Sequence, residues 1–254
     1  MRRLAIRNYY RSPGVNGNAE LSFEHLIGLT LSSSKVRLRT TIHAGRGLFS
    51  KASEKEGTII LGGQKPLARG KNYSELIGGM MLQLSRDQVN QKPSDLLKVV
   101  ANLAFPSNLS FDSLTPLEVR EVEEGMDQVK TYVNKNAESL FELMEVDRDL
   151  YLRLWGVLSV NAVRSPSHHV LALLGSISLM NHSCYPTCGL QFDKNSEIVN
   201  VVTLRDMKKD EQLTFNYCEI QSERQSWTGK ERADYLRSSY NIICTQSQNN
   251  CQCI

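Results

Sequence analysis

Residues 179–186 read LMNHSCYP, and residues 210–217 read DEQLTFNY. The first stretch places a dense run of polar, turn-forming residues directly after an apolar segment at residues 171–180. Buried amide and imidazole groups are costly unless they have hydrogen-bond partners. We therefore expect something to bind the NHSCYP run, and its pairing with the downstream ExLxFxY run is the most informative feature of the chain.

The composition is that of an ordinary globular protein. The chain has 254 residues, of which 41% are hydrophobic and 22% are charged. This length suits one large domain or two small ones, and it is sufficient to bury a core. No stretch approaches the roughly 18 apolar residues that a membrane-spanning helix needs. We therefore expect a monomer that does not associate with a membrane.

Positive charge is concentrated near the N-terminus. Residues 1–40 hold seven basic and two acidic residues, and the rest of the chain has a net charge of −2, so we expect no direct nucleic-acid partner. Residues 1–19 include four arginines and no acid, with Arg3, Arg7 and Arg11 on one helical face. This pattern predicts a mitochondrial transit peptide. A short disordered basic tail, with residence in the nucleus or cytoplasm, is the alternative.

Periodicity predicts an α+β fold in which strands flank a long helical segment. The strand patterns lie at residues 35–39, 58–61, 170–173, 189–192, 197–204 and 214–217. The helical patterns lie at residues 96–103, 115–135, 137–158 and 229–240. Thr115, Pro116 and Glu118 form a typical helix start, with a capping threonine, a first-position proline and a third-position glutamate.

Together, the motifs resemble those of the SET-domain protein lysine methyltransferases. A Gly-Arg-Gly motif precedes the helical segment, and the NHSCYP and ExLxFxY runs follow it, in the order typical of that family. The nearest likeness is to the SET-and-MYND branch, although residues 62–150 contain no cysteine or histidine, so the zinc-rich MYND module is missing. The likeness covers residues 34–254, and its motifs are specific only as a set.

The resemblance implies a domain plan and a fold. It implies a SET domain at residues 34–220, built as a β-rich core of small sheets with a helical insert at about 70–155. A basic extension at residues 1–33 would precede this domain, and a short cysteine-containing, post-SET-like tail at residues 221–254 would follow it.

The resemblance also implies S-adenosylmethionine as the cofactor, bound in part by two motifs. At Gly45, Arg46 and Gly47 the missing side chains would let the backbone approach the cofactor, with Arg46 near its carboxylate. The side chain of Asn181 and the backbone of His182 would fix its amino-acid and adenine portions. Taken alone, the first motif is also a common turn between strands, and the second is also a turn residue beside a core histidine.

Three further positions match or depart from the family pattern. Asn161 matches another cofactor-contacting asparagine. Ile242 stands where the family often has a phenylalanine that stacks on adenine, so apolar contact remains and ring stacking is lost. Thr187 stands where the family usually has asparagine, which puts the local turn geometry in doubt.

Tyr217 is the candidate catalytic residue, although a tyrosine at a strand end is ordinarily a packed aromatic. A lysine ammonium has no lone pair, and neutralising it near pH 7 costs about 4 kcal/mol. An apolar channel and the sulfonium charge of the cofactor both lower that cost. Tyr217 would then orient the amine for in-line displacement rather than act as a strong base. Phe215 and Tyr240 would line the lysine channel, and Phe215 alternatively belongs to the core.

Four cysteines form a candidate zinc site. The resemblance assigns Cys184, Cys244, Cys251 and Cys253 to a tetrahedral thiolate centre, although the tail spacing departs from the usual Cys-x-Cys-x-x-Cys. The alternative is a tail with free thiols. Cys188 and Cys218 are expected to be small core residues.

The sequence thus predicts a protein lysine N-methyltransferase that acts on a protein substrate. The alternative is a catalytically inactive SET-like module that binds protein. A doubly wound small-molecule methyltransferase is disfavoured, because that fold needs a glycine-rich strand-turn-helix opening and alternating strands and helices.

Overall fold

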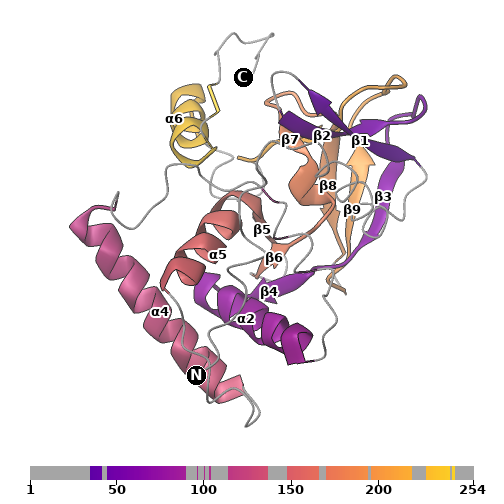
Figure 1. The fold of residues 1–254 in the computed structure, drawn as a ribbon. Coiled ribbons are helices and arrows are strands. Elements are labelled where there is room, and N and C mark those ends of the chain that lie inside the picture. The colour runs from indigo at the N-terminus through magenta and orange to yellow at the C-terminus, as the bar shows by residue number, and fades with distance from the viewer. Residues whose placement is uncertain are drawn as a thin grey trace. The chain divides into compact units, whose positions relative to one another are not determined.

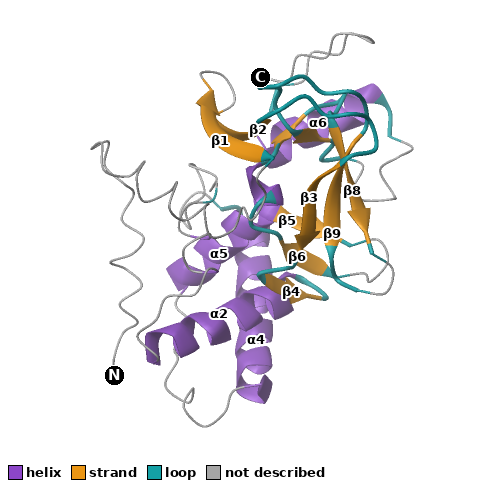
Figure 2. Cartoon of the chain, turned by 90° about the vertical axis from the view of Figure 1, so that its right-hand side faces the viewer, coloured by secondary structure: helices purple, strands orange, loops and turns teal. Residues whose placement is uncertain are grey.

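The computed structural model describes residues 35–41, 45–89, 96, 100, 103, 114–136, 148–165, 170–193, 196–218, 227–240 and 242–243 (Figure 1). The predicted α+β class is confirmed, since the described residues combine helices with small sheets (Figure 2). Two compact units divide the chain. The helical unit contains residues 67–162 and 170–173, and the β-rich unit contains residues 27–66, 163–169 and 174–254.

Among the described residues, the helical unit contains three helices and a short antiparallel ladder of two strands that lie far apart in sequence. The helices are α2 (Tyr73–Val89), α4 (Pro116–Asn136) and α5 (Arg148–Asn161). Strand β4 (Ala68–Gly70) pairs antiparallel with β6 (Leu171–Leu173). The helices pack on one another through fully buried apolar side chains that include Leu76, Ile77, Met80, Met81, Leu154 and Leu158. Removing this apolar surface from water is the main source of stability in the unit.

The start of α4 follows the predicted capping pattern. The backbone N–H and the hydroxyl of Thr115 both donate to the Glu118 carboxylate at 2.7 Å. In return, the Glu118 N–H donates to the Thr115 hydroxyl oxygen at 3.3 Å. This reciprocal arrangement satisfies backbone donors that the helix leaves open. The predicted helix at residues 115–135 is therefore confirmed to within one residue at each end.

Other predicted helices are only partly covered by the described residues. The prediction at 137–158 overlaps α5, which begins at Arg148 and extends to Asn161. The prediction at 96–103 lies almost entirely outside the described residues, as do the basic N-terminal segment and the tail cysteines. Within the part of the chain that the structure describes, no helix is both long and apolar enough to cross a bilayer.

Among the described residues, the β-rich unit contains one three-stranded sheet and two separate two-stranded sheets. Strands β3 (Ile59–Gln64), β9 (Val199–Thr203) and β8 (Cys188–Phe192) form an antiparallel sheet with β9 in the centre (Figure 2). Strand β1 (Val36–Thr41) pairs antiparallel with β2 (Gly45–Ser50).

The remaining two-stranded sheet of this unit is parallel. Strand β7 (Asn181–His182) pairs with β10 (Thr214–Phe215). The short helices η4 (Ile177–Leu179) and α6 (Gly229–Tyr240) belong to the same unit. Strand β5 (Ala162–Arg164) contains the point where the chain passes from the helical unit into the β-rich unit.

The Gly-Arg-Gly motif does not form the turn that the sequence suggested. Gly45, Arg46 and Gly47 lie inside β2, where Gly47 pairs with Arg39 of β1. Glycine disfavours strands, but pairing and burial of neighbouring side chains override this preference. Leu48, fully buried, and Phe49, at 8% exposure, supply that burial here.

The loop that joins β9 to β10 is fastened to the end of β2 by its backbone. The Ser50 N–H donates to the Glu211 carbonyl at 2.9 Å, and the Asp210 N–H donates to the Ser50 carbonyl at 3.0 Å. Asp210 has a positive φ of 67°, a conformation that asparagine and aspartate tolerate better than most residues. Its carboxylate also forms ion pairs with Arg37 and Arg39 of β1.

Two glycines of the helical unit are expected to respond in opposite ways to alanine. A Cβ on Gly125 would collide with the buried hydroxyl of Tyr151, whereas a Cβ on Gly79 would meet nothing closer than 3.9 Å. Urea denaturation should show that Gly79→Ala stabilises the protein by roughly 0.5–1 kcal/mol, because alanine favours helix. Gly125→Ala should destabilise it by roughly 1 kcal/mol, because the free-energy cost of overpacking against Tyr151 exceeds the gain in helix propensity.

Tyr151→Phe provides the control for this pair. Removing the hydroxyl removes the atom that the new methyl group meets first, so Gly125→Ala should cost less in that background. An equal cost in both backgrounds would show that the Tyr151 hydroxyl is not the obstacle.

Candidate active site

The structure brings the two signature stretches side by side in the β-rich unit. In the parallel ladder of β7 and β10, Asn181 pairs with Thr214 and His182 pairs with Phe215. One further bond extends this ladder, because the Ser183 N–H donates to the Phe215 carbonyl at 3.2 Å. The NHSCYP run is thus held by the run that contains Tyr217.

The imidazole ring of His182 fixes the backbone of Tyr217. The ring is buried, with the residue only 7% exposed, and its Nδ1 accepts the Tyr217 backbone N–H at 3.1 Å. Because Nδ1 accepts, the neutral ring carries its proton on Nε2. Nε2 lies 3.3 Å from the sulfur of Cys184 and can donate to it. The sequence assigned only the backbone of His182 a role, and its spacing gave no signal for this side-chain bond.

The phenol of Tyr217 is held in one direction. Its hydroxyl donates to the Met180 carbonyl at 2.8 Å, so the oxygen keeps lone pairs that can accept a hydrogen bond from another group. Burial raises the pKa of Tyr217 well above its ordinary value. The side chain is therefore a neutral phenol at physiological pH, which makes it unsuited to act as a base.

The predicted channel residues surround this phenol. The Tyr217 ring centroid lies 4.8 Å from that of Phe215 and 4.7 Å from that of Tyr240, with tilted planes in both pairs. The centroid of the His182 ring lies 5.2 Å from that of Tyr217, and these planes are also tilted. Tilted arrangements at these distances are favourable between aromatic rings. Tyr240, the last residue of α6, thus joins the residues of β7 and β10.

Gly47 is required where β2 meets β7. The Nδ2 of Asn181 donates to the Arg46 carbonyl at 3.1 Å, which ties the Gly-Arg-Gly motif to the NHSCYP run. A Cβ on Gly47 would lie 3.0 Å from Asn181 Nδ2 and would collide with the side-chain amide of Gln212. The sequence predicted that the missing side chain permits a close approach, and the close approach that the structure shows is by these two amides.

Polar donors gather beside Gly47. The Nε2 of Gln212 is buried and has no hydrogen-bond partner among the described residues, a situation that costs about 1–3 kcal/mol. Arg46, whose guanidinium has its pKa lowered by partial burial, is on the same strand as Gly47 and remains a cation at neutral pH. An unsatisfied donor and a cation suit a small ligand that carries a carboxylate. The sequence did not indicate Gln212.

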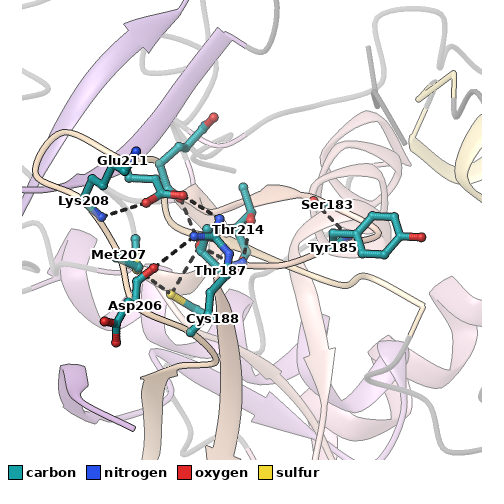
Figure 3. A network of polar contacts seen from close by, with 11 residues as sticks. Ser183, Tyr185, Thr187, Cys188, Asp206, Met207, Lys208, Glu211 and Thr214 are labelled. Carbon is teal, nitrogen blue, oxygen red and sulfur yellow. Dashed lines mark hydrogen bonds and ion pairs between the residues drawn. The ribbon is translucent and has the colours of Figure 1, made fainter. Parts of the chain in front are cut away.

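Thr187 closes the turn that follows the NHSCYP run (Figure 3). Its hydroxyl donates to the Gln212 carbonyl at 3.0 Å and accepts the Thr214 N–H at 2.9 Å. The Thr187 N–H in turn donates to the Thr214 hydroxyl oxygen at 3.1 Å. Thr187 is buried, so these bonds satisfy groups that water does not reach. The threonine therefore holds β10 without the amide of the family's usual asparagine.

Two predicted cofactor contacts stay predictions. Asn161 belongs to the helical unit, at the end of α5, where its Nδ2 donates to the Val157 carbonyl at 2.7 Å. Ile242 is half-buried in the β-rich unit, and its N–H donates to the Leu236 carbonyl at 3.1 Å.

The zinc site also stays a prediction. Cys184 is half-buried beside His182, but Cys244, Cys251 and Cys253 lie outside the described residues. The described residues contain no group of three or more histidine, cysteine, aspartate or glutamate side chains that could hold a metal ion. Cys188 and Cys218 are buried, as expected of core residues.

Comparison with known proteins identifies a matching family and a related protein. The family model described as the SET domain matches residues 45–218, which is more than half of the chain. The SET domain and MYND-type zinc finger protein 6 of Schizosaccharomyces pombe (strain 972 / ATCC 24843) is 34% identical over 107 residues. That match covers 42% of this chain and 21% of the relative.

Solved structures share the fold at low sequence identity. The SET domain of LSMT bound to lysine and AdoHcy matches with a TM-score of 0.53 and 12% identity, over 92% of this chain and 62% of that one. Rubisco LSMT bound to sinefungin and monomethyllysine matches with a TM-score of 0.53 and 15% identity, over 92% and 57%. The chain therefore spans less than two thirds of the length of each of these relatives.

The hydroxyl of Thr187 is expected to matter more than its methyl group. Thr187→Val keeps the volume but leaves the buried Thr214 N–H without its acceptor, which should destabilise the protein by roughly 2 kcal/mol. Thr187→Ser keeps the hydroxyl and should cost only about 1 kcal/mol for the lost methyl. Chemical denaturation measures both values, and a larger loss for serine would contradict this account.

Cys188 is expected to make stability sensitive to alkaline pH. Burial raises the pKa of its thiol from 9.0 to about 11. Below about pH 9 the thiol is protonated in both the folded and the unfolded state, so its contribution to the free energy of unfolding is fully present there. As pH rises toward about 11, the unfolded state loses this proton first and stability falls, by roughly 2–3 kcal/mol in all.

The measurement is the free energy of unfolding across this alkaline window, compared with Cys188→Val. Other groups titrate in the same window, so the difference between the two proteins isolates the thiol. Parallel curves for the wild type and the variant would contradict the assignment.

Proposed function

The chain belongs to the SET-domain family, and on this premise we propose that it is a protein lysine N-methyltransferase that uses S-adenosylmethionine. The observation that carries the proposal is the placement of Tyr217. Its phenol is oriented by the Met180 carbonyl, its backbone is held by His182, and its ring lies among aromatic side chains. The SET domain of LSMT, which shares the fold, was solved bound to lysine and AdoHcy, and this supports the same chemistry here.

Residues beside Gly47 would hold the cofactor. The amide of Gln212 offers a buried donor, and Arg46 offers a cation for a carboxylate, while the missing side chain of Gly47 lets the Gln212 and Asn181 amides approach the strand. When bound, S-adenosylmethionine supplies a sulfonium-activated methyl group to a nucleophile. Asn181, whose amide is already anchored on the Arg46 carbonyl, would fix the distance between β2 and β7 around this ligand.

The aromatic residues would prepare the acceptor amine. Loss of contact with water beside Phe215 and Tyr240 would disfavour the ammonium form, so the lysine side chain would give up its proton to water more readily. The phenol oxygen of Tyr217, whose own hydrogen points to Met180, can accept an N–H from the neutral amine. That bond would fix the direction of the nitrogen lone pair.

Several finer features are also part of the proposal. Residence in the mitochondrion rests on the basic pattern of residues 1–19, and bound zinc rests on Cys184 and the three tail cysteines. Both concern residues that lie wholly or mostly outside the described part of the chain.

Labelling with radioactive cofactor tests the proposed activity. The protein is incubated with S-adenosyl[methyl-³H]methionine and a lysate, and labelled proteins are separated and sequenced for modified lysine. Tyr217→Phe should lower transfer by roughly 100-fold, because it removes a positioned polar group. Binding of S-adenosylmethionine, measured by calorimetry, should be retained. The matched control is Tyr185→Phe, which removes a hydroxyl from a side chain that is 53% exposed, and it should keep full activity.

The alternative function gives a different result. A catalytically inactive protein-binding module would label no protein above background, in the wild type or in either variant. Equal labelling by the wild type and Tyr217→Phe would instead show methyl transfer that does not use this phenol.

A further inference from the structure

A chain of aromatic side chains leads from α6 to Tyr217. The Trp227 and Tyr235 rings meet edge to face, with centroids 5.4 Å apart. Tyr235 meets Tyr240 in the same way at 5.7 Å, and Tyr240 lies 4.7 Å from Tyr217. Tyr235 is thus the link between Tyr240 and the start of α6. No sequence pattern predicted a role for Tyr235.

The contact between Tyr235 and Tyr240 is not a consequence of helix periodicity. Side chains five positions apart point about 140° away from one another around an α-helix, so they are not neighbours on its surface. The two rings meet because α6 ends at Tyr240, where the side chain is no longer confined by a following turn. The Ile242 N–H, bonded to the Leu236 carbonyl, closes this end of the helix.

The two hydroxyl groups also meet. The Tyr235 and Tyr240 oxygens lie 3.4 Å apart, and either can donate to the other. A ring contact alone lets Tyr240 swing about its first side-chain torsion, whereas a bond at the far end of the side chain restrains that swing. Both residues are half-buried, so they lie near the surface of the unit rather than in its core.

We propose that Tyr235 is a positioning residue that holds Tyr240 against Tyr217 and thereby sets how tightly the acceptor lysine is bound. This inference rests on the proposed methyltransferase function, in which Tyr240 lines the lysine channel. Tyr235 is expected to act mainly on the acceptor side, because its hydroxyl meets that of Tyr240, which lies against Tyr217, whereas Asn181 and Arg46 belong to β7 and β2.

The test is Tyr235→Phe, which keeps the ring and removes the hydroxyl. With the acceptor protein found by labelling, KM for the acceptor should rise about two- to threefold, the effect of one long hydrogen bond. The affinity for S-adenosylmethionine should not change, and the melting temperature should fall by no more than about 2 °C. Tyr235→Leu, which also removes the ring contacts, should raise KM further. The matched control is Tyr132→Phe in α4 of the helical unit, which should change none of these values.

Fluorine NMR gives a readout that does not depend on activity. With 3-fluorotyrosine in place of Tyr240, Tyr235→Phe should shift or broaden the fluorine resonance, because the ring loses its restraint. An unchanged resonance, or an unchanged acceptor KM, would overturn the proposal. A rise in KM accompanied by a loss of cofactor affinity and a larger fall in melting temperature would also overturn it, since that pattern indicates a general structural role.

The two proposals fail in different ways. If the wild type transfers no methyl group to any lysine, the proposed function fails, and the positioning role toward the acceptor fails with it. The fluorine experiment then still decides whether the Tyr235 hydroxyl restrains Tyr240. If the wild type is active and Tyr235→Phe behaves like it, only the inference about Tyr235 fails.

Discussion

The hydrogen bond from the Tyr217 backbone to Nδ1 of His182 is the interaction on which the site depends. Strands β7 and β10 are two residues long, and so short a ladder is weak by itself. The buried imidazole adds a bond beyond the ladder and sets where the chain turns after Phe215. The orientation of the phenol toward Met180 and its contact with Tyr240 follow from that turn.

Much of the fold could be predicted because its signals are local. The cap at Thr115 and the apolar pattern of the strands depend on neighbouring residues, so the sequence displays them directly. The path of Gly45–Gly47 could not be read in this way, because two glycines favour a turn locally and only pairing with β1 makes them a strand. Similarly, two-residue strands such as β7 show no periodicity at all.

Three central residues of the candidate site could be predicted from the sequence, but the hydrogen bonds that hold them could not. The motifs indicated Asn181, His182 and Tyr217, and the structure places them together. The side-chain role of His182 and the contribution of Tyr235 depend on residues distant in sequence or on the end of a helix. Thr187 shows the same point, since its hydroxyl serves as both donor and acceptor only because Thr214 lies opposite.

The brevity of the parallel ladder limits which changes this site can undergo during evolution. Successive residues in a strand face opposite sides, so a slip of one position would exchange the directions of Asn181 and His182. The amide would then leave the Arg46 carbonyl at the same moment that the imidazole left Tyr217. Insertions or deletions inside either short strand therefore remove two functions at once, whereas individual side chains around them can be exchanged one at a time.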